Sequence, residues 1–450
     1  MSDGNLRERL TQVGPERLAD ALLELAARND EVDDMVKRVT ASPMENTRRF
    51  KAKLAGLKRA RRFIDWRGAS GFARELEDML ADLEAGVDDP KTGVEMVAAF
   101  FEVDQHIFEQ CDDSSGSVGD VFRCAACDLF VHYGSRCADK AWLVDRLVEL
   151  YGHDDYGVRD VLIDAAHRFL PKESLRDLAD RLWQRSEKGR PHTYEARHWL
   201  LGVESVARQL KDAVLYEKAQ RAAWPELSAS AHIDIAQAYL EAGNVKTALT
   251  WLESVQNETF RSSDRDDLLL AVYRKLGDTD KAAEVAWRIF RGHRSKDTLK
   301  TLLSVIGKDK RESVMESEAR NILASGRLSH SDAKFLIESG RIDEAEAYLL
   351  DHTDELDGNR YTSLLPLAES MEKNGRWLAA NLIYRALLDS ILARAVSKYY
   401  HHGIKYLKKL GKLAGKITDW KEFGDHESYM AALRRDHGRK TSFWAGYTGE

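Results

Sequence analysis

The sequence has few of the residues that cross-link or interrupt a fold. Only 4 of its 450 residues are cysteine and only 7 are proline, so neither a disulfide framework nor a proline-rich architecture is indicated. No run approaches the roughly 20 apolar residues that a membrane-spanning helix needs. The charged start, Met1 to Leu10, lacks the apolar core of a signal peptide. We therefore expect a cytoplasmic protein with no membrane segment.

Two further absences limit the fold and the chemistry. No strand-like alternation of apolar and polar residues competes with the helical periodicity, so an all-α chain is expected. The GxSxG, HExxH, Walker A and Rossmann glycine patterns are also missing. An enzyme on this chain would need a site assembled by the fold alone, and no cofactor or small-molecule substrate is indicated.

Positive charge does not dominate the chain. Its 68 lysine and arginine residues are outnumbered by 75 aspartate and glutamate residues, for a formal net charge of −7. A protein of this balance does not present a generally cationic surface to nucleic acid or to anionic lipid. Any basic surface on this protein must therefore be confined to a short part of the chain.

A repeated phrase runs from about Ser228 to about Leu410. A glycine in a polar turn is followed five residues later by an alanine, in the pairs Gly243/Ala248, Gly277/Ala282, Gly340/Ala345 and Gly375/Ala380. The glycines are 34, 63 and 35 residues apart, so the middle gap has room for one degenerate copy. A period near 34, with Gly ending one helix and Ala on the next, is typical of tetratricopeptide-type hairpins. We expect a right-handed α-α superhelix, a tetratricopeptide-like solenoid.

The expected organisation has three parts. Residues 1–223 form an N-terminal helical domain of degenerate repeats, and residues 224–410 form the tetratricopeptide-like repeats. Residues 411–450 form a capping helix with a basic and aromatic tail, because a terminal repeat needs a polar outer face.

Two segments are locally basic. A helix expected from Met44 to about Trp66 has eight basic residues and no acidic one between Arg48 and Arg62, and Lys398 to Lys416 holds six lysines and no acid. The segments 48–62 and 398–440 could bind nucleic acid through its phosphates. The alternative for the first is a solvated face matched by the acidic helix expected at 75–84.

An acidic phrase lies between two apolar helices expected at 94–111 and 124–133. It contains Asp112, Asp113, Ser114, Ser115, Gly116 and Asp120. Such residues before a helix can accept hydrogen bonds from its unpaired amides. The alternative is a metal-dependent hydrolase in which Asp112, Asp113 and Asp120 hold the ion.

Four cysteines occur close to this phrase, at positions 111, 124, 127 and 137. The Cys-x-x-Cys step of Cys124 and Cys127 allows a zinc site, but it falls on an expected helix rather than in a knuckle. Small buried thiols are the alternative. No metal ligand is assigned.

Three phrases together resemble a bacterial domain family of unknown function. They are Arg61–Trp66 (which includes Asp65 and Trp66), Asp112–Gly116 with Gly119–Arg123, and His437–Lys440 with Phe443-Trp444. The resemblance would cover most of the chain. It implies a cytosolic bacterial helical-repeat protein and brings no activity with it. Similar arrays can follow a SWIM-type zinc finger, but the Cys-x-Cys…Cys-x-His pattern is absent here.

The function expected is a non-enzymatic scaffold that binds a protein or peptide along the concave face of the solenoid. Projection of the tetratricopeptide template places six residues on that face, namely Gln237, Glu241, Asp267, Arg274, Glu369 and Glu372. The set is more acidic than basic, so the expected ligand is a helical or basic segment. Nucleic-acid association is the second alternative and the metal-dependent hydrolase is the third.

Overall fold

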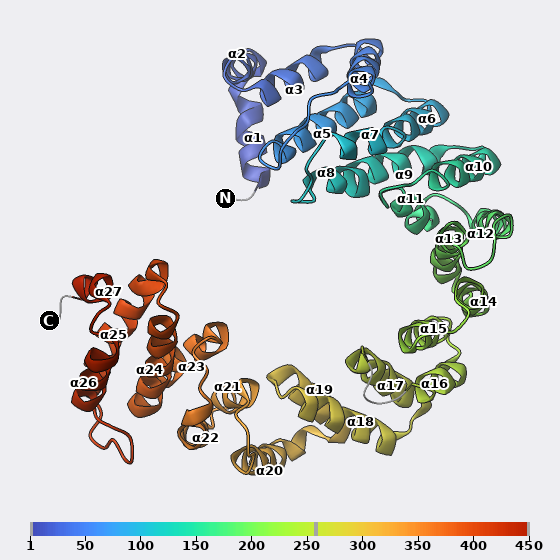
Figure 1. Ribbon diagram of the computed structural model, residues 1–450. Helices are drawn as coiled ribbons and strands as arrows, with labels where there is room; N and C mark the ends of the chain where they lie inside the picture. Colours follow the sequence, from blue (N-terminus) through green and yellow to red (C-terminus); the bar gives the residue numbers. More distant parts are fainter. Residues whose placement is uncertain (1–2, 256–259, 448–450) are drawn as a thin grey trace. The chain divides into compact units, whose positions relative to one another are not determined.

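The computed structural model describes residues 3–255 and 260–447, and the chain is helical throughout these ranges (Figure 1). In them the only strand-like pairing is a single bridge between Ile64 and Cys111. The all-α fold class is therefore confirmed. None of the described helices has both the length and the apolar character needed to cross a bilayer. The chain forms two compact units, Met1–Arg261 and Ser262–Glu450.

The N-terminal unit contains helices α1 to α16. Their bounds are α1 Asp3–Val13, α2 Pro15–Ala26, α3 Asp30–Thr40, α4 Pro43–Leu57, α5 Ala69–Gly86, α6 Pro90–Phe101, α7 Asp104–Glu109, α8 Ser117–Asp120, α9 Cys127–Arg136, α10 Lys140–Tyr151, α11 Asp160–Asp164, α12 Lys172–Ser186, α13 Tyr194–Leu210, α14 Ala213–Ala223, α15 Ala229–Glu241 and α16 Val245–Glu253. A π-helical turn, Val121–Ala126, joins α8 to α9. Its Phe122 is fully buried against Phe100 and Phe101, with ring centroids 5.0 and 5.7 Å away.

The C-terminal unit contains helices α17 to α27. Their bounds are α17 Ser262–Leu276, α18 Thr279–Gly292, α19 Lys296–Ile306, α20 Arg311–Leu323, α21 His330–Glu338, α22 Ile342–Asp351, α23 Tyr361–Lys373, α24 Trp377–Arg394, α25 Tyr400–Ala414, α26 His426–His437 and α27 Thr441–Gly446. Its largest fully buried side chains include Phe290, Phe335, Tyr348 and Tyr384. Sequential helices pack as antiparallel pairs, such as α17 with α18 and α23 with α24 (Figure 1).

The four glycines of the repeated phrase all end a helix in the left-handed conformation. Their φ angles are 86° at Gly243, 74° at Gly277, 81° at Gly340 and 73° at Gly375. In each turn the amide after the glycine donates to the carbonyl five residues back, as Asn244 does to Tyr239 at 2.8 Å. This is the Schellman arrangement, which satisfies carbonyls that the helix leaves unpaired.

The four alanines of the phrase occupy equivalent positions. Each is the fourth residue of the second helix of its pair, and each is at most 2 % exposed. A methyl group there allows the two helices to approach closely. The 63-residue gap between Gly277 and Gly340 holds two further helices, α19 and α20, without the Gly/Ala spacing. They pack on α18 and α22 respectively.

Some helices that the sequence predicts are shorter or interrupted. The helix expected to reach Trp66 ends at Leu57, because the residues that follow turn to pair with the segment before α8. The helix expected over 94–111 is broken after Phe101, where buried Asp104 begins α7 and forms a two-bond ion pair with Arg159 at 2.6 and 2.8 Å. The helix expected over 124–133 starts inside the π-helical turn.

Candidate functional site

Backbone hydrogen bonds join the two distinctive phrases of the N-terminal unit. The amide of Ile64 donates to Gln110 O at 2.8 Å, and the amide of Asp112 donates to Ile64 O at 2.9 Å. His106 Nε2 lies 2.8 Å from Ala60 O. The loop between α4 and α5 is therefore attached to the rest of the unit at two places.

Within this loop the side chains have separate roles. The carboxylate of Asp65 accepts hydrogen bonds from the amides of Arg67 and Gly68, at 3.0 and 3.1 Å, and so shapes the turn. Phe63 and Trp66, on either side of the anchored residues, are 59 % and 56 % exposed. The loop thus presents two aromatic side chains to solvent.

The acidic phrase folds into a turn that its own carboxylates stabilise. Asp113 accepts from the amides of Val118 and Gly119, at 2.9 and 2.8 Å, with one carboxylate oxygen for each. Asp112 accepts from the amide of Ser114 at 3.1 Å. The amides at the start of α8 are therefore satisfied by side-chain oxygen, which is the role of a helix cap.

The carboxylates of this turn are also the candidate metal ligands of the hydrolase alternative. Asp120 is exposed and lies 4.0 Å from Arg123, and both oxygens of Asp113 are occupied by amides. Across the described ranges, no three His, Cys, Asp or Glu side chains converge as a metal site. Cys111, Cys127 and Cys137 are buried as free thiols, and burial raises the pKa of Cys127 to about 11. That thiol is protonated at neutral pH.

The six residues expected on a concave face lie on three separate helices. Gln237 and Glu241 are on α15 of the N-terminal unit, whereas the other four are on α17 and α23 of the C-terminal unit. Several are held by the protein itself. Gln237 donates to Glu241 at 2.7 Å, and Arg274 donates to Ser304 at 2.5 Å. Glu372 accepts from Lys409 at 2.8 Å, so this carboxylate is only partly available to a ligand.

The cations of α4 divide into two sets. Lys53 reaches Asp34 on α3 and Asp82 on α5, each at 3.0 Å, and Arg49 reaches the same two carboxylates at 3.4 Å. Asp82 is fully buried. Arg48 and Lys51 instead lie exposed on the outer surface of the helix. The expected neutralisation by an acidic helix therefore applies to Arg49 and Lys53, which face inward, and not to Arg48 and Lys51.

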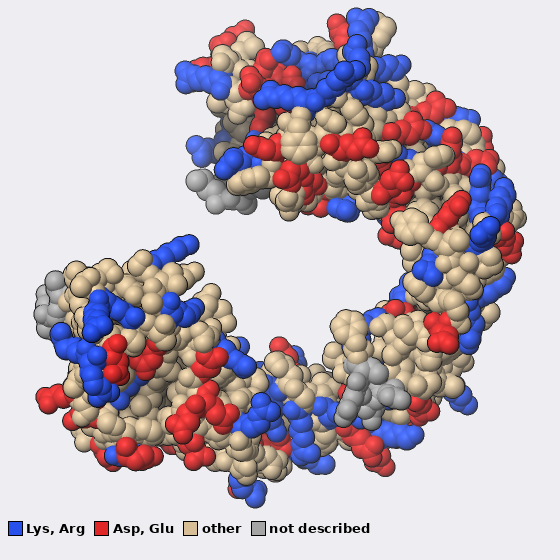
Figure 2. All heavy atoms as spheres, viewed as in Figure 1, with Lys and Arg blue, Asp and Glu red and all other residues tan. Residues whose placement is uncertain are grey.

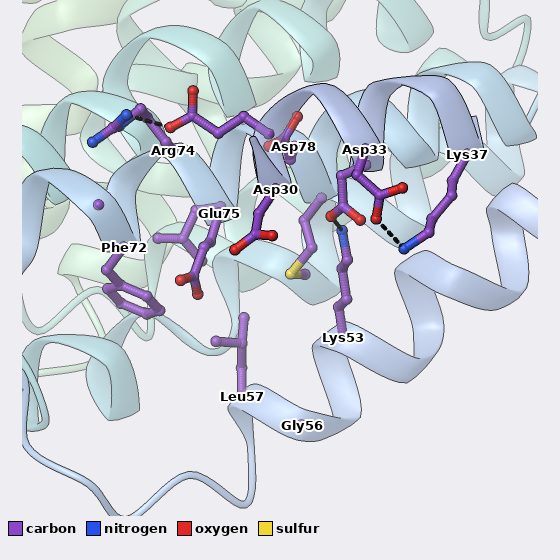
Figure 3. Close-up of a pocket in the computed structure, with 15 residues that line it drawn as sticks. Asp30, Asp33, Lys37, Lys53, Gly56, Leu57, Phe72, Arg74, Glu75 and Asp78 are labelled. Atoms are coloured by element: carbon purple, nitrogen blue, oxygen red, sulfur yellow. Dashed lines mark hydrogen bonds and ion pairs between the residues drawn. The ribbon is translucent and has the colours of Figure 1, made fainter. Parts of the chain in front are cut away.

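A cleft of about 680 Å³ lies between α3, α4 and α5 (Figure 3). Its apolar lining comes from α4 and α5, in Leu57, Phe72, Leu76 and Met79. Its rim carries six carboxylates, namely Asp30, Glu31, Asp33, Asp34, Glu75 and Asp78. An apolar floor with a charged rim is the usual composition of a site for an amphipathic ligand.

The cations beside the cleft are already neutralised. Lys37 pairs with Asp33, Lys53 with Asp34, and Arg74 with Glu31. The hydrogen bond to Asp33, together with the charge of that carboxylate, raises the pKa of Lys37. Burial favours the neutral form of Asp34, but its hydrogen bond and ion pair with Lys53 hold its pKa below the ordinary value.

Two carboxylates of the cleft carry uncompensated charge. Asp30 and Glu75 have no ion pair within residues 3–255 and 260–447, and their side chains extend into the cleft beside Phe72 and Leu57 (Figure 3). Asp78 pairs with Arg38 at 3.1 Å, so six carboxylates against four cations leave a formal charge of −2. The sequence shows acidic residues on both helices but not that α3 packs beside α5, so that carboxylates of both helices line one cleft.

A family model supplies the comparison with known proteins. The model of a family of unknown function, DUF6880, matches residues 5–224 and again residues 217–446. The chain belongs to this family. The resemblance drawn from the sequence phrases is confirmed at that level, and DUF6880 membership brings no activity to either unit. No curated protein matches the chain.

Proposed function

We propose that this DUF6880 protein is a non-enzymatic interaction scaffold whose helical pairs stack as a right-handed, tetratricopeptide-like superhelix. Its binding site is the cleft between α3, α4 and α5, and its ligand is a basic amphipathic helix of a partner protein. The four Schellman turns and the four buried alanines support the helical stacking, because neighbouring pairs must cover one another's apolar faces.

The uncompensated charge of the cleft is the observation that favours this ligand. An amphipathic helix placed on the apolar floor would bury its hydrophobic stripe against Phe72 and Leu57. Its lysine or arginine side chains would then reach Asp30 and Glu75. A helix is about 10–12 Å wide with its side chains, so a cleft of about 680 Å³ receives one face of it.

The cleft replaces the concave residues of the two units as the proposed contact. Glu372 and Arg274 are held by neighbouring side chains, whereas Asp30 and Glu75 extend into open space. The expected chemistry of the partner, a helical and basic segment, is unchanged.

A charge reversal at the cleft tests the proposal. A fluorescent helical peptide built from leucine and lysine should bind the wild type, and binding to the double variant Asp30→Lys/Glu75→Lys should be weaker by about 30-fold, since each reversed rim charge costs about 1 kcal/mol. Fluorescence anisotropy at fixed ionic strength measures both affinities. A leucine–glutamate peptide of the same length should not bind.

The matched control makes the same charge change elsewhere in the unit. Glu95 and Glu226 are exposed, and Glu95→Lys/Glu226→Lys should bind the leucine–lysine peptide as the wild type does. Equal affinity of the cleft variant and the wild type would show that the peptide binds elsewhere, and the cleft assignment would then be wrong.

A further inference from the structure

A second surface of the N-terminal unit has the opposite charge. In Figure 2 lysine and arginine side chains gather over the part of this unit where α4 lies in Figure 1. The exposed members from α4 and the loop after it are Arg48, Lys51, Lys58, Arg59, Arg61, Arg62 and Arg67. We call these seven side chains the basic surface. None of them forms an ion pair in the part of the chain that the structure describes.

The basic surface is unusual for this chain, because the whole sequence has a net charge of −7. Its cations are not used for folding, unlike Arg49 and Lys53 on the inner side of the same helix. Asp65 is the only acidic residue from position 46 to position 67, and its carboxylate is bonded to backbone amides. The local field is therefore strongly positive and attracts phosphate.

Phosphate attraction alone does not explain the exposed aromatic side chains. Phe63 and Trp66 lie among the cations at 59 % and 56 % exposure, and the guanidinium of Arg67 stacks over Trp66 at 4.6 Å. A hollow of about 570 Å³ beside the loop is lined by Phe63 and Arg62. It adjoins the acidic cleft, because Leu57, Phe72 and Glu75 line both. A flat aromatic group with polar edges, such as a nucleobase, fits these surroundings.

The loop that carries the aromatic residues is held in place before any ligand binds. Its backbone is fixed at Ala60 by His106 and at Ile64 by the two bonds to Gln110 and Asp112. Ordering therefore costs little when a ligand binds, which favours affinity. This anchoring also assigns a role to the acidic phrase, because Asp112 supplies one of the two bonds.

We propose that the basic surface, with Phe63 and Trp66, binds single-stranded nucleic acid. The cations contact phosphates while unpaired bases stack on the two rings, which is how sequence-tolerant single-strand binding arises. A duplex offers the same phosphates but keeps its bases stacked inside, so it would leave both rings unused. This proposal rests on the seven cations and the two exposed rings, none of which lines the acidic cleft, although the hollow beside the rings adjoins that cleft.

The test uses the full chain and a fluorescent oligothymidylate of about 16 nucleotides, the upper end of common single-strand site sizes. We expect Phe63→Ala/Trp66→Ala to bind at least about tenfold more weakly than the wild type, with an unchanged salt dependence. Arg61→Glu/Arg62→Glu should also bind at least tenfold more weakly and should show a smaller salt dependence, because fewer counterions are released. Thermal melts check that both variants fold.

The control variant reverses two exposed lysines of the other basic segment, Lys405→Glu/Lys408→Glu, and should bind the oligonucleotide as the wild type does. Equal loss in this control would show non-specific charge attraction and would overturn the proposal. So would an unchanged affinity of Phe63→Ala/Trp66→Ala, or equal affinity for a duplex of the same length. Binding to vesicles of equal parts phosphatidylserine and phosphatidylcholine, without binding to the oligonucleotide, would assign the surface to a membrane instead.

Discussion

Two segments that contain both basic and aromatic residues, residues 48–67 and residues 398–444, have different structural roles. In the first, the aromatic Phe63 and Trp66 are exposed and seven cations face solvent. In the second, Phe443 is fully buried and Tyr400 is 7 % exposed, with their rings 5.7 Å apart. Phe63 and Trp66 therefore belong to a surface, whereas Phe443 and Tyr400 belong to a core, as does Phe50 at the start of the first segment.

Two cations of the C-terminal segment are held by the protein itself. Lys409 donates to Glu372 and to Tyr384, at 2.8 and 2.7 Å. Lys416 lies 4.1 Å above the ring of Trp377. Lys409 attaches α25 to the helices before it, and Lys416 does the same from the turn after α25. Both contribute to capping, whereas Lys405 and Lys408 are exposed. Composition alone therefore does not distinguish a ligand surface from a cap.

The largest expected effect comes from the buried aromatic residue. Phe443→Ala should destabilise the packing of α27 on α25 by about 3–5 kcal/mol, because it leaves a cavity where a fully buried ring was. Amide hydrogen exchange of α25 and α27 measures the loss locally. Exchange at the wild-type rate would mean that α27 does not cap the unit.

The second effect concerns the inward side of α4. Asp82→Ala should cost about 3 kcal/mol, because it removes a buried carboxylate that Lys53, Arg49 and Arg38 surround at 3.0, 3.4 and 3.7 Å. Urea unfolding of the N-terminal unit, followed by hydrogen exchange in α4 and α5, measures it. A cost below 0.5 kcal/mol would show that the ion pairs of Lys53 and Arg49 with Asp82 do not stabilise the unit, and that these cations are no different from the exposed ones on the outer side of α4.

A smaller effect is expected from pH at the C-terminal segment. Burial favours the neutral acid, but hydrogen bonds from Lys409 and Tyr384 hold the pKa of Glu372 below its ordinary value. The ion pair therefore stabilises the unit above the ordinary glutamate pKa of about 4.3 and is lost as pH falls through the lower folded value. Glu372→Gln should cost about 1 kcal/mol at pH 7 and progressively less in acid.

The melting temperature from pH 7 downward measures this dependence. Glu369→Gln is the control, because Glu369 is an exposed residue one turn away on α23. The control should follow the wild type at every pH. A cost for Glu372→Gln that does not change with pH would show that the ion pair with Lys409 contributes nothing.

The smallest expected effect is at the exposed rings. Phe63→Ala and Trp66→Ala should each change the free energy of unfolding by less than about 0.5 kcal/mol, because both side chains are mostly in solvent. Thermal melts of both variants provide the measurement. A loss as large as that of Phe443→Ala would show that the loop is part of a core, and the comparison between the segments would fail.

Local patterns were sufficient for the helical pairs of the repeated phrase. Gly243 and its three equivalents adopt positive φ, which glycine reaches without steric cost, and the alanines five residues later are buried. The end of α4 was not predictable in this way. Residues 58–66 have helical periodicity, but the hydrogen bonds of Ile64 to a segment more than 40 residues away hold them in a loop.

The cleft also could not be predicted from the sequence pattern. The sequence indicates a helix at 30–39 and an acidic helix at 75–84, which correspond to α3 and part of α5. Whether their carboxylates pair with α4 depends on which way each side chain faces after packing. Asp34 and Asp82 face α4, whereas Asp30 and Glu75 face the cleft.

By itself, the sequence determined that this chain is all-α, where its repeated turns fall, and that it resembles an uncharacterised family, because these properties depend on residues close together in the chain. Tertiary structure alone decided which cations are paired, which aromatic rings are buried, and where an acidic cleft opens. The physical reason is that charge and apolar area have their effect through whatever lies opposite them, and the opposite residue is distant in sequence.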